Sequence, residues 1–534
     1  MVTPRGYAAK YGTAAEVPEG TAGRIAPLQS GAVMFCGTAS DVGKSILTAG
    51  FCRYLVRRGM NVAPFKSQNM SLNSFVTPEG GEIGRAQAVQ AEACRIPPHT
   101  DMNPVLLKPN SDTGSQIIVQ GRPVANMSVT EYDGYKPVAF EKIRESFGRL
   151  HARHSFVVIE GAGSIAEINL RSKDIANMKI ADLADCPVIL VADIDRGGVF
   201  AQIVGTIELL EPAERARVKG VVINKFRGDV TILTPGIEFI EQRTGVPVLG
   251  ILPWLKDIRL PDEDSVALVR KRTNCAAEQG VSRIRIGVIR VPRISNFTDF
   301  EPLQREEDVE LSYIEHPEEL AALDVLILPG SKSTIADLGF VREQGLDEAI
   351  QRFTGKIVGI CGGFQMLGTT LLDPHQVESS VVEACGLDLL PSTTELLAEK
   401  ATHQVRARLA QGGVLGSVDG ELVGYEIHMG VTTLAEGTRP LLQIIRRGDE
   451  SVLIEDGAIS PDGRIFGSYL HGIFDNDNFR QSYLNEIRRS KGMPLRSGLV
   501  EPLSDPFDQP ALQLEKHLDM AAILTLCGLD SDGR

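Results

Sequence analysis

Short runs of valine, isoleucine, leucine and alanine alternate with longer amphipathic segments along most of the chain. Such apolar runs, bounded by glycine and polar residues, are typical of buried parallel strands, and the periodic segments between them are typical of the connecting helices. The runs lie at residues 32–35, 62–65, 156–159, 188–192, 221–223 and 246–251, and then at 284–291, 325–328, 357–360 and 465–469. The two series predict an α/β protein with two tandem parallel-sheet domains.

The stretch between the two series is polar and irregular, which is typical of an interdomain linker. We therefore predict five segments. These are a disordered tail over 1–28, a first domain over 29–262, a linker over 263–280, a second domain over 281–490 and a C-terminal helical tail over 491–534.

The apolar run at 357–360 leads directly into Cys361-Gly362-Gly363. A strand that ends in a nucleophile followed by glycines predicts a nucleophile elbow, in which a tight turn into a helix exposes the side chain. The positive end of that helix favours a thiolate. His471 follows another predicted strand and is a candidate base for this cysteine. The pattern therefore favours a catalytic cysteine over the alternative of a small buried apolar side chain.

The first predicted strand leads into a loop with glycines at 37 and 43, followed by Lys44, Ser45 and a helix. Backbone N–H groups and a helix N-terminus in such a loop bind phosphate, the lysine reaches the outer phosphates, and the hydroxyl binds Mg²⁺. Five residues separate the glycines here, instead of the usual four. This longer loop resembles that of dethiobiotin synthetase. The predicted ATP-binding residues are Gly37, Thr38, Asp41, Gly43, Lys44, Ser45 and Asn224.

Two further residues follow strands of the first series. Glu160 stands before Gly161 at a strand end, where a carboxylate beside a phosphate loop is suited to bind Mg²⁺ or to position water. Asn224 also follows a strand and is a candidate to hold the adenine edge of the nucleotide, as is the turn at Ile251-Leu252-Pro253. The predicted metal ligands are therefore Ser45 and Glu160.

Composition narrows the class of protein further. The net charge of −14 and the 5% aromatic content argue against nucleic acid as a partner, and an anionic substrate would need a local basic patch. The sequence contains no run of 18 apolar residues, so no membrane span is predicted, and its N-terminus lacks the apolar core of a signal peptide. The eight cysteines form no CxxC pair, so we expect neither a zinc site nor disulfides. This pattern of cysteines predicts a cytoplasmic location. The composition is compatible with a homo-oligomer.

The two sites, in this order, resemble the cobyric acid synthases, a family of glutamine-dependent amidotransferases of cobalamin biosynthesis. The stretches that carry the resemblance lie at residues 64–74, 112–116, 295–300 and 424–430. The first of these discriminates best, because cobyrinic acid a,c-diamide synthases differ there. A partitioning-type P-loop ATPase is a second alternative, but those proteins lack a cysteine elbow domain.

The resemblance implies that glutamine is hydrolysed in the second domain and that ammonia moves to the first. There ATP activates the b, d, e and g carboxylates of a corrinoid, adenosylcobyrinic acid a,c-diamide, which become amides. Cys361 would attack glutamine with His471 as the proton shuttle, and the oxyanion donors would be Gly362, Gly330 and Ser331. An enclosed ammonia path between the two sites is expected.

Three questions stay open in the sequence. The residue two positions after His471 is isoleucine, where commoner triad amidotransferases have glutamate, so Asp475 or Glu426 is left to orient the histidine. His428 is a rival base. The predicted substrate-binding residues, downstream of the second strand, are Lys66, Gln68, Asn69 and Asn73.

Overall fold

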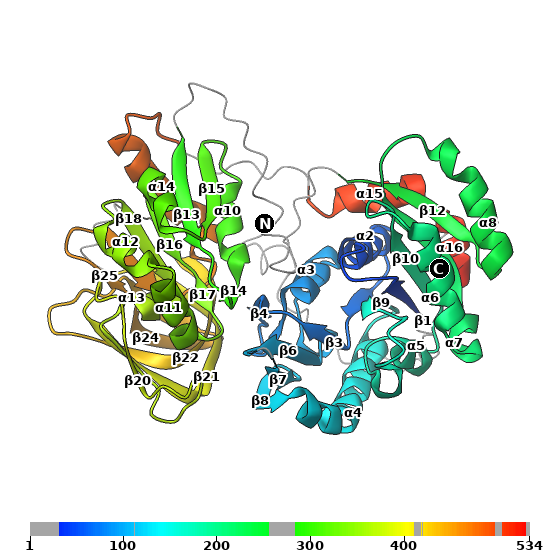
Figure 1. The fold of residues 1–534 in the computed structure, drawn as a ribbon, viewed down its shortest axis with the longest axis horizontal. Helices are drawn as coiled ribbons and strands as arrows, with labels where there is room; N and C mark the ends of the chain where they lie inside the picture. Colours follow the sequence, from blue (N-terminus) through cyan, green and yellow to red (C-terminus); the bar gives the residue numbers. More distant parts are fainter. Residues whose placement is uncertain are drawn as a thin grey trace, which may run out of the picture.

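The computed structural model describes residues 31–111, 113–255, 283–410, 418, 420–496 and 505–529. It contains two α/β bodies, one blue to green and the other green to orange along the chain in Figure 1. The predicted tail over 1–28 and the predicted linker over 263–280 lie outside the described residues.

The first body is built on a six-stranded sheet with the order β12-β11-β10-β1-β9-β2. All its neighbouring strands are parallel, so their carboxyl ends meet at one edge, where ligand sites of such sheets form. The strands are β1 (Gly31–Gly37), β2 (Val62–Phe65), β9 (Phe156–Ser164), β10 (Val188–Asp193), β11 (Val218–Phe226) and β12 (Val248–Pro253). Each of the six predicted strands of the first series is present.

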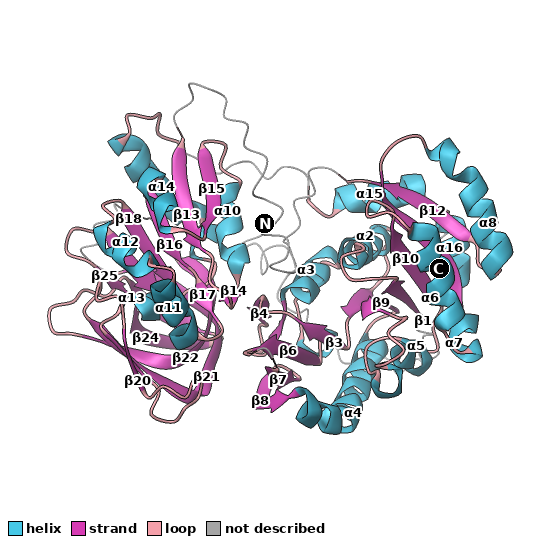
Figure 2. Ribbon diagram, in the orientation of Figure 1, coloured by secondary structure: helices cyan, strands magenta, loops and turns pink. Residues whose placement is uncertain are grey.

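Helices cover both faces of this sheet, as Figure 2 shows. They are α2 (Lys44–Arg57), α3 (Arg85–Ala93), α4 (Val129–Arg153), α5 (Met178–Leu183), α6 (Val199–Leu209), α7 (Pro212–Arg217) and α8 (Thr234–Thr244), with short turns η1 (Thr100–Met102), η2 (Arg171–Lys173) and η3 (Val230–Leu233). A four-stranded sheet and a hairpin lie toward the second body: β3 (Gln68–Met70), β6 (Val105–Pro109), β7 (Gly114–Val119) and β8 (Arg122–Ser128), and β4 (Ser74–Val76) with β5 (Glu82–Gly84).

The second body has a six-stranded sheet with the order β15-β13-β16-β18-β26-β25, parallel except for its last pair. The strands are β13 (Ile284–Ile289), β15 (Val309–Ile314), β16 (Val325–Leu328), β18 (Lys356–Ile360), β25 (Ala458–Ile459) and β26 (Ile465–Ser468). The helices and turns are η5 (Phe297–Phe300), α10 (Glu301–Gln304), η6 (Pro317–Ala322), α11 (Thr334–Glu343), α12 (Leu346–Arg352), α13 (Gly362–Leu367), η7 (Ile473–Asp475) and α14 (Asp477–Ser490).

A second, mainly antiparallel sheet completes this body. It comprises β19 (Thr370–Leu372), β20 (Glu383–Cys385), β21 (Ser392–Leu409), β22 (Leu422–Leu434), β23 (Leu442–Arg447) and β24 (Glu450–Asp456). A short pair, β14 (Ile294–Ser295) with β17 (Gly330–Ser331), joins the loops at the carboxyl ends of β13 and β16. The sequence pattern did not predict these strands.

The last two described helices, α15 (Asp508–His517) and α16 (Met520–Leu526), return to the first body (red in Figure 1). Their apolar side chains, including Leu514 and Ile523, share one buried cluster with β1 and α2. The guanidinium of Arg53 in α2 is fully buried and pairs with Asp505, just before α15. The C-terminal helical segment is therefore part of the first domain's core.

Candidate active sites

Cys361 lies between β18 and α13, in a backbone conformation that few side chains adopt. Its φ of 52° and ψ of −111° are strained for a residue with a Cβ, at a typical cost of about 1–3 kcal/mol. Cys361 is 6% exposed. A Cβ on Gly363 would lie 2.0 Å from the Leu328 carbonyl oxygen, so only glycine lets α13 pack this closely against β16. This is the geometry of the predicted elbow.

His471 follows β26 and is completely buried next to this turn. Its Nδ1 donates to Oδ2 of Asp299 at 2.6 Å, and Asp299 Oδ1 accepts from the Gly472 N–H at 3.2 Å. Burial disfavours the imidazolium, but the charge and hydrogen bond of Asp299, together with Cys361, outweigh burial and raise the pKa of His471 to about 10. Nε2 makes no regular hydrogen bond within the described residues, and Cys361 is among the groups that raise the pKa of His471.

Asp299 is the residue that the sequence analysis missed. It lies in the 295–300 stretch that carried the family resemblance, but 172 positions before the histidine, so spacing gives no signal of their contact. Of the two candidates proposed from the sequence, Glu426 instead receives two hydrogen bonds from Arg447, at 2.8 and 2.9 Å. Asp475 makes no hydrogen bond to His471 in the described chain. Asp299 therefore replaces both as the partner of the histidine.

The rival base, His428, occupies a different environment. Its ring stacks on Tyr469 with the centroids 3.7 Å apart, and its Nδ1 contacts the Gly430 carbonyl oxygen at 3.1 Å. Its Nε2 lies 3.8 Å from Glu426. No contact joins His428 to Cys361 among the residues that the structure describes. The geometry therefore favours His471 as the base.

The three predicted oxyanion donors lie close together beside Cys361. A Cβ on Gly362 would come within 2.9 Å of the Ser331 backbone nitrogen, and one on Gly330 within 3.4 Å of His471 Cε1. The pairing of β14 with β17 fixes the Gly330–Ser331 strand in this place. Backbone N–H groups from two strand ends are thus available near the carbon that the thiol would attack.

The phosphate-binding loop between β1 and α2 has the predicted form. Lys44 Nζ donates to the carbonyl oxygens of Ala39 at 3.1 Å and Gly163 at 3.0 Å, across the mouth of the loop. A Cβ on Gly37 would lie 2.8 Å from that nitrogen, so glycine there leaves room for the lysine. Asp41 adopts a left-handed φ of 58° and pairs with Arg196 at 3.1 Å. The cavity beside the loop is lined by Thr38, Asp41, Gly43, Lys44 and Ser45.

Asn224, the predicted adenine contact, is not among the residues that line this cavity. Its Nδ2 donates to the Val42 carbonyl oxygen at 2.8 Å, and a Cβ on Gly43 would lie 2.2 Å from that nitrogen. Gly43 itself has a φ of 96°. Asn224 therefore supports the loop from β11, and the following Lys225 is the residue that reaches the cavity.

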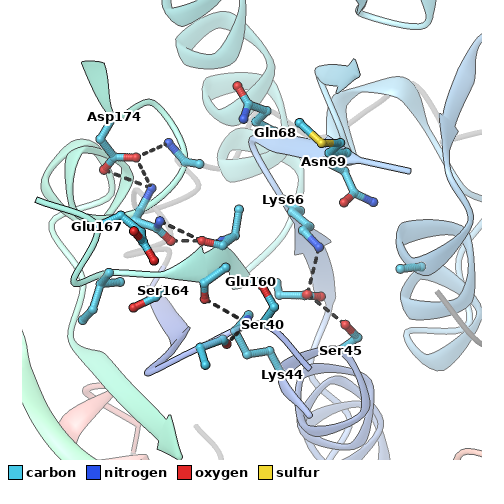
Figure 3. Close-up of a pocket in the computed structure, with 18 of the residues that line it drawn as sticks. Ser40, Lys44, Ser45, Lys66, Gln68, Asn69, Glu160, Ser164, Glu167 and Asp174 are labelled. Atoms are coloured by element: carbon cyan, nitrogen blue, oxygen red, sulfur yellow. Dashed lines mark hydrogen bonds and ion pairs between the residues drawn. The ribbon is translucent and has the colours of Figure 1, made fainter. Parts of the chain in front are cut away.

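Glu160 is the centre of a buried polar cluster in this cavity (Figure 3). Its Oε1 accepts hydrogen bonds from Ser45 Oγ at 2.9 Å and Lys66 Nζ at 3.0 Å, and its Oε2 accepts one from Gln90. A hydroxyl and a carboxylate oxygen in contact form a donor set of the kind that Mg²⁺ uses when phosphates and water supply its other ligands. Ser45 and Glu160 therefore fit a magnesium ion.

The cavity has a volume of about 830 Å³ and continues from the phosphate loop to β3. Its charged lining comprises six basic residues (Lys44, Lys66, Lys136, Arg171, Lys173 and Lys225) and five acidic ones (Asp41, Glu160, Glu167, Asp174 and Glu214). This balance differs from the −14 of the whole chain, so the cavity is a more favourable place for an anion than the average surface.

The predicted substrate residues divide into two groups. Lys66, Gln68 and Asn69 line the cavity, where Figure 3 shows them on one side of it. Gln68 accepts from the Tyr132 hydroxyl at 2.6 Å, and Asn69 donates to Gln87 at 3.1 Å. Asn73 does not line the cavity. It lies 1% exposed at the contact with the second domain, where its Oδ1 accepts from the Phe297 N–H at 3.2 Å.

Comparison with known protein families assigns a class to each half of the chain. Residues 33–267 match the CobQ/CobB/MinD/ParA nucleotide binding domain, and residues 285–479 match the CobB/CobQ-like glutamine amidotransferase domain. Fold, sites and family models thus define one class: an amidoligase with a P-loop domain followed by a glutamine amidotransferase domain.

Full-length relatives narrow the class to one family. The chain is 48% identical to cobyric acid synthase of Syntrophobacter fumaroxidans, over 95% of this chain and 99% of that protein. It is 48% identical to that of Moorella thermoacetica, over 93% and 98%, and 50% identical to that of Sorangium cellulosum, over 93% and 99%. The chain belongs to the cobyric acid synthase family. Neither alternative class, the a,c-diamide synthases or the partitioning ATPases, is favoured by these relatives.

None of the helices that the structure describes has the length and apolar character that a membrane span requires.

Proposed function

We propose that this chain amidates the b, d, e and g carboxylates of adenosylcobyrinic acid a,c-diamide, with ATP and glutamine, to give adenosylcobyric acid in cobalamin biosynthesis. The observation that carries the proposal is the strained Cys361 elbow beside the Asp299–His471 pair, on the same chain as a phosphate-binding loop. Membership of the cobyric acid synthase family supports the choice of substrate.

In the second domain, the geometry suits hydrolysis of glutamine through a thioester. A carboxylate only accepts hydrogen bonds, so Nδ1 of His471 carries the proton shared with Asp299, and Nε2 is left to exchange protons with Cys361. The sulfur of Cys361, as the thiolate, bonds to the carboxamide carbon, and Nε2 of the protonated His471 gives its proton to the departing nitrogen. The C–N bond breaks, ammonia leaves, and water hydrolyses the thioester to glutamate. The N–H groups of Gly362 and Ser331 would stabilise the oxyanion.

In the first domain, ATP would convert a poor acyl electrophile into a reactive one. A carboxylate oxygen of the corrinoid attacks the γ-phosphorus, ADP leaves, and ammonia then displaces phosphate from the acyl phosphate. Lys44 and Lys66 would offset negative charge on the phosphates and the carboxylate. Mg²⁺, when bound, neutralises and orients the phosphate oxygens, and Ser45 and Glu160 would hold it.

We further propose a cytoplasmic enzyme, because the seven described cysteines are all free, as expected in a reducing compartment.

Two variants test the proposed function by mass spectrometry of the corrinoid after incubation with ATP, Mg²⁺ and either glutamine or ammonium. Cys361→Ala should lower glutamine-dependent amidation by about 10³-fold or more and retain ammonium-dependent amidation, because only the thioester step needs the sulfur. Lys44→Ala should lower both, because both need the activated carboxylate. Full glutamine-dependent activity in Cys361→Ala would exclude this cysteine as the nucleophile.

A further inference from the structure

The two domains contact each other next to His471. Strand β4 of the first domain packs against β22 of the second, where the rings of Phe75 and Tyr425 lie 5.3 Å apart. The Tyr425 hydroxyl also donates to the Ser74 carbonyl oxygen at 3.4 Å. The Tyr425 ring also stacks on His471, with the centroids 5.2 Å apart and an interplanar angle of 14°.

A tight turn over residues 296–299 lies between this contact and the histidine. Asn296, at the start of the turn, has a left-handed φ of 51°. Its Oδ1 accepts from the Ser74 N–H at 3.0 Å, and its Nδ2 lies 3.3 Å from the Tyr425 hydroxyl and 3.5 Å from His471 Nδ1. The turn is thus held in a strained conformation partly by a backbone group of the other domain.

Asn73 holds the same turn from a second point. Its side-chain Oδ1 accepts from the Phe297 N–H at 3.2 Å, two residues before Asp299. Both Asn73 and Phe297 are buried, so loss of this acceptor would leave a buried backbone N–H without its partner, which is unfavourable. A shift of the turn would move the Asp299 carboxylate away from His471.

We infer that Asn73, a residue of the nucleotide-binding domain, is a positioning residue for the glutaminase: it fixes the turn that places Asp299 on His471. The inference rests on the proposed function of Cys361 and His471. It gives the contact between the domains a role in the glutamine reaction, because the base is held in place only where β4 is docked. Asn73 also follows β3, whose Gln68 and Asn69 line the nucleotide cavity, so one short segment contacts both sites.

The test is glutamate release from glutamine by the full-length protein in the presence of ATP and Mg²⁺, compared with ammonium-dependent amidation. Asn73→Ala should lower glutamate release by about 10- to 100-fold, which corresponds to the cost of the lost acceptor. Ammonium-dependent amidation should change by less than about 3-fold, because the nucleotide cavity keeps its lining.

A matched variant separates positioning from general weakening of the interface. Thr402→Val removes another hydrogen bond between the domains, from Thr402 Oγ1 to the Gly80 carbonyl oxygen at 2.9 Å, without touching the 296–299 turn. It should leave glutamate release unchanged. Equal losses in both variants would overturn the inference, as would full glutamate release in Asn73→Ala.

A pH profile supplies a readout that a purely structural role would not move. Since Asp299 raises the pKa of His471, its displacement in Asn73→Ala should lower that pKa and shift the alkaline side of the glutamate-release profile to lower pH. An unshifted profile would contradict the inference. Asn73→Ser, a milder truncation, should show the same shift and serves if the alanine variant does not fold. Failure of ammonium-dependent amidation in the unmodified protein would instead refute the proposed function.

Discussion

The pairing of Asp299 with His471 gives the glutaminase site its electrostatic character. An imidazole that is wholly buried would normally lose its proton more easily, but here the adjacent carboxylate reverses that tendency. The result is a base whose protonated form is stabilised and whose ring orientation is fixed by a short hydrogen bond. A proton donor of this kind suits a step in which ammonia must leave with a proton.

Asp299→Asn tests this pairing through stability. The folded-state pKa of about 10 lies above the ordinary value of 6.5, so the contribution of His471 to the free energy of unfolding is complete below about pH 6.5 and is lost as the pH rises toward 10. Denaturant titrations across this window should show the decline in the unmodified protein and a much smaller one in Asp299→Asn. Glutamate release by the variant should also fall.

Asp475→Asn is the matched control, because Asp475 lies close by in η7 without a hydrogen bond to the histidine in the described chain. It should leave the decline of stability between pH 6.5 and 10 in place. If stability declined equally over this pH range in Asp299→Asn, the pairing of Asp299 with His471 would not be its cause.

Local sequence determines the geometry at some single residues. The elbow at Cys361 and the lysine of the phosphate loop follow from glycines next to strand ends, and the structure has both. Asp299 and Asn73 could not be placed in this way, because their partners lie 172 and 224 positions away along the chain. Such contacts arise from tertiary packing, and one sequence has no signal for them.

At the scale of elements, the junction of β18 with α13 depends on the absence of side chains. Gly363→Ala would place a Cβ 2.0 Å from the Leu328 carbonyl oxygen and 2.5 Å from its carbonyl carbon, which are backbone atoms of β16 and cannot rotate away. We expect a loss of at least about 1–3 kcal/mol in the free energy of unfolding, together with reduced glutamate release as Cys361 shifts. Denaturant titration and the glutaminase assay measure the two effects.

Gly339→Ala provides the comparison within the same domain. This glycine lies in α11 with open space around its Cα, so alanine should leave stability unchanged or raise it by up to about 1 kcal/mol. If Gly363→Ala were as well tolerated, the close packing of α13 on β16 would not be needed for the elbow.

The central strands were predictable because they are buried on both faces and read as continuous apolar runs. All ten predicted strands appear in the two mainly parallel sheets. Some strands of the other sheets escaped prediction because they are exposed or alternate between buried and exposed residues. β8, for example, is exposed along most of its length, and in β24 only Asp456 is buried. Neither has an apolar run that distinguishes it from a loop.

At the scale of the whole molecule, a buried ion cluster joins the two domains. Glu82 is fully buried and accepts hydrogen bonds from Lys108 Nζ of its own domain, at 2.8 Å, and from Lys400 Nζ of β21 in the other. Burial disfavours the carboxylate, but the two lysines outweigh it and hold the pKa of Glu82 well below its usual range. A complete cluster of this kind has little net effect on the free energy of unfolding. Loss of one member is strongly destabilising, because it leaves an uncompensated buried charge.

Glu82→Gln should therefore lower the free energy of unfolding by about 3–5 kcal/mol, since two buried lysines lose their common counter-ion. Calorimetry and denaturant titration measure the loss, and a second transition would indicate that the domains then unfold separately. Glu348→Gln, which breaks an exposed pair with Arg352, should change stability by less than about 0.5 kcal/mol. A similarly small effect at Glu82 would mean that its cluster does not stabilise the docked arrangement.

The position of α15 and α16 has a consequence for how the protein is made. Both helices complete the apolar cluster around β1 and α2, yet a ribosome synthesises them only after the entire second domain. Chains are synthesised at about 5–20 residues per second, so the apolar face of the first domain stays uncovered for about tens of seconds while the second domain is made. The glutaminase half can finish folding first, and the half that would consume ATP is completed last, so chaperones are expected to hold the early segment.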